Sequence, residues 1–549
     1  MKREPGIRDC LLAPTEFVTR FPQTDAPPRR RPGPRWQGRR DEAQLLVGND
    51  TQLDPGLRRG GRCGDAAHSL SRHAVVACGI SSKAPRILSG ALSLALTACT
   101  TAGPNYALPD RAAVNNPSAQ GQFDSGREKA FVDTPLPDHW WQLYGDPRLD
   151  GFVTEALAAN TDLRAADANL RRADAVVAEV AAGRTLSTVL GGGTSLDRPY
   201  TTGGNLPGTL DYNLGITLAY PLDLSGRIRR GIEAAQGDAE AVAAARDNVR
   251  VTVAAETARS YATACTANMV LAANNRILAL QRQTLNVTQR LQRGGRGTAF
   301  DVTRARTAVD QSEALIPAQV ATRTAALYRL ATLMGRAPAD YPKDVATCAK
   351  PPALNRPLPI GDGAALIRRR PDIRGAERTL AAATARIGVA TANLYPQVSL
   401  GGSAGFTGPV SSLGSTNAFH LGLGPLISWS FPNRPVVRAQ IAQAGATADQ
   451  ALAQFDSTTL EALRQTETAL SAYAREGDRN AALRRAQSSA ARAADQAGTL
   501  YRFGRTDFLS LLTAQAALTT AQANLAASDA LLVDRQVDVF KALGGGWQT

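Results

Sequence analysis

The chain repeats itself, and no other feature constrains its fold as strongly. Three short motifs recur at an offset of 209 or 210 residues. They are Asp162–Ala166 with Asp372–Ala376, Leu190–Gly192 with Leu400–Gly402, and Gly295–Arg296 with Gly504–Arg505. Two copies of one unit of about 200 residues therefore make up nearly the whole chain, and a fold for one copy has to serve for both.

Each copy begins with a helix followed by two strands. Apolar residues at helical spacing predict a helix over Pro147–Gly183. Alternation of apolar and polar residues then predicts strands over Leu186–Leu196 and Tyr212–Tyr220, paired as a β-hairpin with a long exposed tip. The corresponding strands of the second copy are expected over Gln397–Phe406 and Phe419–Phe431.

A very long helix follows each β-hairpin, because proline is missing where it would break one. No proline lies between Pro221 and Pro317, and none follows Pro435. The first long helix is predicted over Ser225–Leu291, which at about 1.5 Å per residue extends for roughly 100 Å.

A glycine-containing turn then reverses the chain in each copy, at Gly294–Phe300 and at Phe503–Leu509. An alanine-rich helix returns from each turn and ends at Gly335 or Gly544. The repeated unit is thus a β-hairpin joined to a long α-hairpin, and the predicted fold class is mostly α.

Four strands are too few to close a barrel in a membrane. Lipid offers no partner to an open sheet edge, and the smallest membrane barrels have about eight strands. A chain with two β-hairpins must therefore share a barrel with other copies. We expect a homotrimer with a 12-stranded β-barrel, in which the long helices lie side by side as a hollow cylinder.

Residues 83–98 have the features of an export signal. Lys83 and Arg86 are positive, an apolar run too short to span a bilayer follows, and small residues precede Cys99. This order predicts a bacterial lipobox with a covalent lipid on Cys99 and no other cofactor, and Thr100 favours sorting to the outer membrane. The alternative is a short buried helix that happens to end in cysteine.

Residues 1–82 precede this signal, although export signals normally begin a chain. The segment is rich in Pro, Gly and Arg and lacks a hydrophobic period, so it is expected to be disordered or a mis-assigned N-terminal extension. The predicted divisions are 1–82, the lipoprotein signal 83–98, the lipid-anchored N-terminus with repeat 1 over 99–355, and repeat 2 over 356–549.

The net charge of +14 does not indicate a nucleic-acid-binding protein. The first 98 residues hold 16 Lys and Arg against 9 Asp and Glu, and elsewhere the basic residues are scattered among acidic ones along helices. Beyond Cys99 only His139 and His420 occur, and no nucleophile–base motif or metal-ligand spacing stands out. Neither an enzyme nor a metal site is expected.

Two cysteines, Cys265 and Cys348, remain once Cys99 and the residues before it are set aside. In an oxidising periplasm they can form a disulfide, or they can stay as two separate buried thiols. The sequence leaves both alternatives open.

Several motifs resemble the signatures of TolC-like outer-membrane efflux factors, in particular the NodT-type lipoproteins of RND efflux systems. They are Trp140–Leu149, Arg369–Ile373, Asn393–Pro396, Lys541–Trp547, and Gly103–Tyr106 following Cys99. The resemblance spans the chain from Cys99 to the C-terminus. One departure is local: the first copy has Thr185–Leu186 where the second has Tyr395–Pro396.

The resemblance implies a passive trimeric channel with a 12-stranded barrel in outer-membrane lipid and a long periplasmic α-barrel. Such channels dock with a periplasmic adaptor protein and an inner-membrane pump, usually a proton-driven RND-type pump. The implied cargo is drugs or other small toxic molecules, and the implied location is the cell outer membrane with an extension into the periplasm.

By the register of the repeats, the two turns would form the periplasmic entrance, where related channels constrict the pore and meet the adaptor. The candidates for this gate and adaptor tip are Gly295, Arg296, Gly297, Asp301, Gly504, Arg505, Thr506 and Asp507. Their arginines and aspartates could form ion pairs that hold the entrance shut. Because Asp301 and Asp507 lie near helix starts, helix capping explains them equally well.

Aromatic residues near the strand ends could form membrane-interface girdles or pack a core. They are Tyr212, Tyr220, Phe419, Trp429 and Phe431.

The alternative function is a periplasmic adaptor or a structural coiled-coil lipoprotein. An adaptor is expected to have one helical hairpin within split lipoyl-like halves, and a coiled-coil filament would lack the alternating strands.

Overall fold

The computed structural model describes residues 101–197, 200–201, 204–205, 208–354 and 356–547, which belong to one compact unit. The predictions for residues 1–82, for the signal 83–98 and for Cys99 fall outside the described residues.

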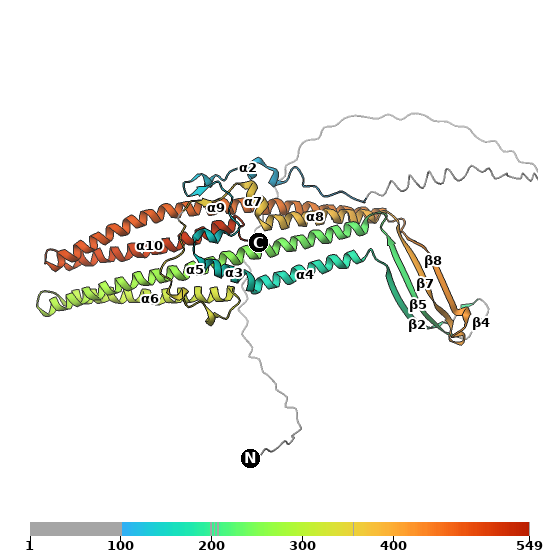
Figure 1. Cartoon of the computed structure of the whole chain (residues 1–549), viewed down its shortest axis with the longest axis horizontal. Coiled ribbons are helices and arrows are strands. Elements are labelled where there is room, and N and C mark those ends of the chain that lie inside the picture. The colour runs from blue at the N-terminus through green and yellow to red at the C-terminus, as the bar shows by residue number, and fades with distance from the viewer. Residues whose placement is uncertain (1–100, 198–199, 202–203, 206–207, 355, 548–549) are drawn as a thin grey trace, which may run out of the picture. The chain divides into compact units, whose positions relative to one another are not determined.

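Four antiparallel strands form a sheet at one end of this unit (Figure 1). Their order is β2 (Ser187–Asp197), β5 (Thr209–Leu222), β7 (Gln397–Pro409) and β8 (Phe419–Ser428). Both predicted β-hairpins are confirmed, because β2 pairs with β5 and β7 pairs with β8. The pairing of β5 with β7 joins the two copies at the centre of the sheet. A short ladder of β3 (Tyr200–Thr201) and β4 (Gly204–Asn205) lies in the tip of the first hairpin.

The single helix predicted over Pro147–Gly183 is wrong. The chain instead forms α3 (Pro147–Ala159) and α4 (Thr161–Ala182), with an extended backbone at Asn160 between them. The Asn160 side-chain oxygen accepts hydrogen bonds from two N–H groups in the first turn of α4, and its nitrogen donates to the carbonyl oxygen of Leu333. A capping side chain therefore ends one helix and begins the next.

The second copy breaks at the corresponding place. Its helices are α7 (Gly363–Arg369) and α8 (Pro371–Ala392), and Arg370 between them has an extended backbone. Pro371 accounts for this break, because proline is favoured at the first position of a helix and disfavours a helical conformation in the residue before it.

The predicted long helices and the helices that return from them are confirmed. They are α5 (Arg227–Arg293) with α6 (Ala299–Leu333), and α9 (Arg434–Arg502) with α10 (Phe508–Ala542). Pro317 lies inside α6, which continues past it.

Helices and strands follow the same lateral order. Next to the sheet, α4 lies beside α5, α5 beside α8 and α8 beside α9, which matches the order β2-β5-β7-β8 of the strands they lead into or out of (Figure 1). Toward the turns the order is α6, α5, α10 and α9. The unit is therefore a layer with two lateral edges.

The main hydrophobic core lies midway along the long helices and takes residues from both copies. The Trp140 ring is fully buried and stacks on Phe540 of α10, with 4.4 Å between the ring centroids. Tyr261 of α5 and Leu470 of α9 belong to the same core. Trp140 thus packs between the copies.

Short elements surround this core. They are η1 (Ala113–Asn115), α2 (Pro117–Gln120), η2 (Ser125–Arg127), β1 (Phe131–Val132) paired in parallel with β6 (Leu358–Pro359), η3 (Trp140–Tyr144), η4 (Pro338–Asp340) and η5 (Val345–Thr347). Two further turns, η6 (Val410–Ser412) and η7 (Thr416–Ala418), connect β7 to β8.

Candidate functional site

One face of the sheet is apolar and exposed. Residues two apart on a strand share a face, and directly paired residues on neighbouring strands share it as well. Leu190 of β2 pairs with Ile216 of β5, and Leu423 of β8 reaches the same face through its partner on β7. This apolar sheet face comprises Leu190, Leu196, Leu210, Leu214, Ile216, Leu400, Phe406, Leu421, Leu423 and Ile427. Leu190 is 76% exposed and Leu423 is 80% exposed.

The opposite face has small and polar side chains. This polar sheet face comprises Asp211, Asn213 and Thr217 of β5, Ser399, Ser403 and Thr407 of β7, His420 and Ser428 of β8, and several glycines. Val189 and Leu426 are the exposed apolar exceptions. A sheet that is apolar on one side and polar on the other is suited to lie between a non-aqueous and an aqueous environment.

Both edge strands of the sheet are open on their outer side. Within the described ranges, β2 pairs only with β5 and β8 pairs only with β7. An exposed edge carries unpaired backbone N–H and C=O groups and is a template for pairing with another strand. The sheet therefore has two free edges that can accept a neighbour.

The five aromatic residues predicted near strand ends lie at two levels. Tyr212 and Phe419 lie toward the hairpin tips, whereas Tyr220 lies near the helical end of β5. Trp429 and Phe431 come directly after β8, and their exposed rings lie 5.2 Å apart between centroids. This placement agrees with two aromatic girdles, which remain a prediction.

In the first copy, the turn joins two helix ends with a capping box. The Thr298 hydroxyl accepts a hydrogen bond from the N–H of Asp301 at 3.1 Å, and the Asp301 carboxylate accepts from the Thr298 N–H at 3.2 Å. Gly295, two residues after the end of α5, has a φ of 68°, which favours glycine.

In the second copy, the acidic residue and the hydroxyl residue of the cap stand in the reverse order. Asp507 caps α10, and its carboxylate accepts a hydrogen bond from the N–H of Ser510 at 2.6 Å. This hydrogen bond lowers the pKa of Asp507 below its ordinary value. In repeat register Asp507 matches Thr298 and Ser510 matches Asp301, so acid and hydroxyl have changed places. Gly504 has a φ of 66° and matches Gly295.

The arginine–aspartate pairs suggested by the sequence do not form within one chain. Arg296 and Arg505 are both exposed, and neither makes an ion pair with another residue in the described part of the chain. Asp301 and Asp507 are engaged as helix caps, and Gly297 and Thr506 directly precede the capping residues. The sequence analysis did not identify Thr298 and Ser510 as partners of Asp301 and Asp507 in the caps, although their three-residue spacing from these aspartates is a capping signal.

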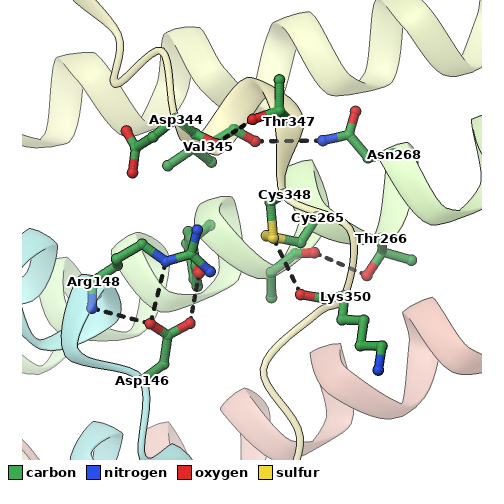
Figure 2. The surroundings of a disulfide bond; sticks show 12 residues. Asp146, Arg148, Cys265, Thr266, Asn268, Asp344, Val345, Thr347, Cys348 and Lys350 are labelled. Atoms are coloured by element: carbon green, nitrogen blue, oxygen red, sulfur yellow. Dashed lines mark hydrogen bonds and ion pairs between the residues drawn. A yellow bond between two sulfur atoms is a disulfide. The ribbon is translucent and has the colours of Figure 1, made fainter.

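A disulfide joins Cys265 of α5 to Cys348, which follows η5 (Figure 2). Their Cα atoms lie 5.0 Å apart, and both residues are buried. The bond fastens the segment between the two copies to the middle of the longest helix of copy 1. The Asn268 side chain donates a further hydrogen bond to the carbonyl oxygen of Val345.

Near this disulfide, Asp146 links α3 to α5 (Figure 2). The Tyr261 hydroxyl donates to the Asp146 carboxylate at 2.6 Å, and the N–H of Arg148 donates to it at 3.0 Å. Burial acts to raise the pKa of Asp146, but these hydrogen bonds and the Arg148 charge outweigh it and lower that pKa. Burial, followed by the hydrogen bond to Asp146, raises the pKa of Tyr261.

Across the described part of the chain, no helix has the length and apolar character needed to cross a membrane. Among the same residues, no three His, Cys, Asp or Glu side chains gather where they could hold a metal ion.

Comparison with known proteins gives matches to both copies. The family described as "Outer membrane efflux protein" matches residues 152–336 and 364–545. Nodulation protein T of Rhizobium leguminosarum bv. trifolii is 31% identical, covering 79% of this chain and 91% of that protein. The solvent efflux pump outer membrane protein SrpC of Pseudomonas putida is 29% identical, and the match covers 78% of this chain and 92% of that protein.

The fold also matches a solved structure. The outer-membrane channel OprN is similar with a TM-score of 0.75 and 36% sequence identity, over 82% of this chain and 100% of that chain.

Proposed function

The chain belongs to the outer membrane efflux protein family, and on this premise we propose that three copies close one channel across the outer membrane. The protein is the outer-membrane component of a tripartite efflux system, a passive conduit and not an enzyme. It lies in the outer membrane and extends into the periplasm.

The observation that carries the trimer is the sheet with an exposed apolar face and two open edges. Lipid can cover the apolar face but cannot satisfy unpaired backbone groups at an edge, so the edges must be paired. If β8 of each copy pairs with β2 of the next, the contact is head-to-tail and closes only in a ring. Three copies of four strands give a 12-stranded barrel, an even number as in bacterial outer-membrane barrels.

The polar sheet face would then line the lumen. Its small residues and glycines leave room for cargo, and its serine, threonine and asparagine side chains provide an aqueous surface. The helices that continue the strands would form the periplasmic α-barrel in the same closed ring, because their lateral order matches that of the strands.

We also propose that Cys99 carries the covalent lipid and that the channel needs no cofactor. Acyl chains there would add a membrane anchor to the barrel. Incorporation of labelled palmitate into the wild-type chain but not into Cys99→Ala tests this assignment. Equal labelling of both chains would contradict it.

The proposed partners are a periplasmic adaptor and an inner-membrane RND-type pump, which would supply the energy. The proposed cargo is drugs or other small toxic compounds, since the relative SrpC is named for a solvent efflux pump. The two turns at the ends of the α-hairpins would form the entrance, with Arg296 and Arg505 free to meet a neighbouring copy or the adaptor.

Deletion and restoration of the gene test the function. Loss should sensitise cells to at least one class of compound in a broad panel, and restoration should reverse this. In outer-membrane fractions the wild-type protein should migrate as a heat-modifiable trimer. A monomer outside the outer membrane would instead favour the adaptor or coiled-coil alternative.

A further inference from the structure

The first described residues lie against the junction between the sheet and the helices. The N–H of Ala102 donates to the carbonyl oxygen of Ser225 at 3.0 Å. Thr101 lies so close to Gly226 that a Cβ added there would overlap its side chain. Because Ser225 and Gly226 connect β5 to α5, Thr101 and Ala102 are fixed at the helical end of the sheet. From there it runs along the helices to α2 (Figure 1).

A buried arginine holds this segment. Arg230 of α5 is only 3% exposed. Its guanidinium donates to the carbonyl oxygens of Ala102 at 3.2 Å and Gly103 at 3.4 Å, and to the side-chain oxygen of Asn105 at 2.6 Å. Its remaining partner is Glu233 at 2.7 Å. A buried cation requires such bonds, and three of the four come from the N-terminal segment.

Neighbouring residues of the same segment fit a complementary surface. Gly103 has a φ of 81°, and a Cβ there would overlap the backbone of Gly388 on α8. In turn, a Cβ at Gly388 would lie 2.7 Å from the Arg230 side chain and 2.8 Å from the Ala102 carbonyl oxygen. The Tyr106 hydroxyl donates to Glu377 of α8 at 3.1 Å. Gly103, Asn105 and Tyr106 thus each have a defined contact.

We propose that Gly103–Tyr106 is a docking motif for the membrane anchor and that Arg230 is the positioning residue that receives it. The proposal rests on the proposed lipid at Cys99 and on the outer-membrane channel. Cys99 precedes Ala102 by three residues, which span about 10 Å at most. Docking therefore confines the lipid to the leaflet beside the helical ends of the strands, and couples anchoring to the placement of the sheet in the membrane.

Arg230→Ala tests this role, with Arg229→Ala as the matched control because Arg229 is the exposed preceding residue of α5. Removing the guanidinium leaves three acceptors of the N-terminal segment unpaired. In the lipidated chain we expect Arg230→Ala to lower the yield of heat-modifiable outer-membrane trimer several-fold, with Arg230→Lys intermediate and Arg229→Ala unchanged. Gly388→Ala should cause a similar loss while keeping the charge.

The same variants are then compared in a chain exported without lipid, with Cys99→Ala and a non-lipoprotein signal. There, Arg230→Ala should cause no further loss of trimer, because no anchor remains to be positioned. An equal fold-loss with and without lipid, or no difference between Arg230→Ala and Arg229→Ala, would overturn the docking role alone. Absence of palmitate from the wild-type chain would instead contradict the proposed anchor.

Discussion

The equivalent long helices α5 and α9 differ sharply in burial. Both are close to 70 residues long (67 in α5 and 69 in α9), but α5 is buried at more than a third of its positions and α9 at fewer than a fifth. No large apolar side chain of α5 is exposed, whereas Val436, Leu460 and Leu500 of α9 are.

The lateral order of the elements explains this difference. Next to the sheet α5 lies between α4 and α8, and toward the turns it lies between α6 and α10, so the chain itself covers both of its sides. α9 continues from the edge strand β8 and has a long helix of the layer beside it on one side only, with the short elements η1 and η2 as further contacts. The duplicated unit thus gives one helix an intramolecular environment and leaves its counterpart at an edge, where a neighbouring copy would cover it in the proposed trimer.

Truncation of a core residue on α5 should have the largest effect on the chain itself. Tyr261→Ala removes a fully buried ring that packs on Phe152 and bonds to Asp146, at a cost of about 3–5 kcal/mol in the free energy of unfolding. Leu460→Ala on α9 should change it by no more than about 0.5 kcal/mol in the separated chain. It should instead lower the trimer fraction seen by size-exclusion chromatography. If Tyr261→Ala and Leu460→Ala had similar urea midpoints as dissociated single chains, the difference in burial between α5 and α9 would not matter for the stability of the chain.

A charge on the apolar sheet face of the edge strand should strongly impair insertion. Leu423→Arg is expected to cost about 2–4 kcal/mol if this face meets the bilayer core. The matched control is Thr217→Arg on the polar sheet face, which would project into the lumen. Thr217 lies at nearly the same height in the sheet as Leu423, because it is aligned through β7 with Gly422, the residue before Leu423. The yield of heat-modifiable trimer in outer-membrane fractions measures both. Equal losses would mean that the two faces are not in different environments.

The disulfide distinguishes the copies, because Cys265 of α5 has no counterpart on α9. Replacing both Cys265 and Cys348 by Ser should lower the free energy of unfolding by about 2–4 kcal/mol, since the bond closes a long loop across the middle of the chain. Reductant should lower the urea midpoint of the wild-type chain but not that of the double variant. A midpoint unaffected by reductant in both chains would contradict a structural role.

The two turns should tolerate exchange of their capping residues. Thr298→Ala should cost about 1 kcal/mol, while Asp507→Thr and the double exchange of Thr298→Asp with Asp301→Ser should keep the caps. Because the folded pKa of Asp507 is lowered, its contribution is present above the unfolded pKa of about 3.9 and is lost as the pH falls through the folded value. The hydrogen-exchange protection factors in the first turn of α10, which correct for the intrinsic pH dependence of exchange, should therefore fall in acid for the wild-type chain and not for Asp507→Thr.

Local sequence patterns predicted most of the helices and strands. The contacts between segments that lie far apart in the sequence could not be predicted from such patterns. The alternation over Tyr212–Tyr220 and the missing proline after Pro221 predicted β5 and α5 to within a few residues. The helix break at Asn160 was missed, although an asparagine before Thr161 and Asp162 is a capping signal. The position of Arg230 against the residues after Cys99 depends on packing across more than 100 residues, which no local period reports.

Disulfide trapping between the edge strands tests the central claim most directly. A cysteine at Gly193 of β2 is combined in turn with cysteines at Gly422, Gly424 and Leu426 of β8, and outer membranes are run on non-reducing gels. Head-to-tail closure predicts a covalent trimer for at least one pair and no larger product. The absence of any crosslink between chains, or a ladder extending beyond three chains, would contradict the closed trimer.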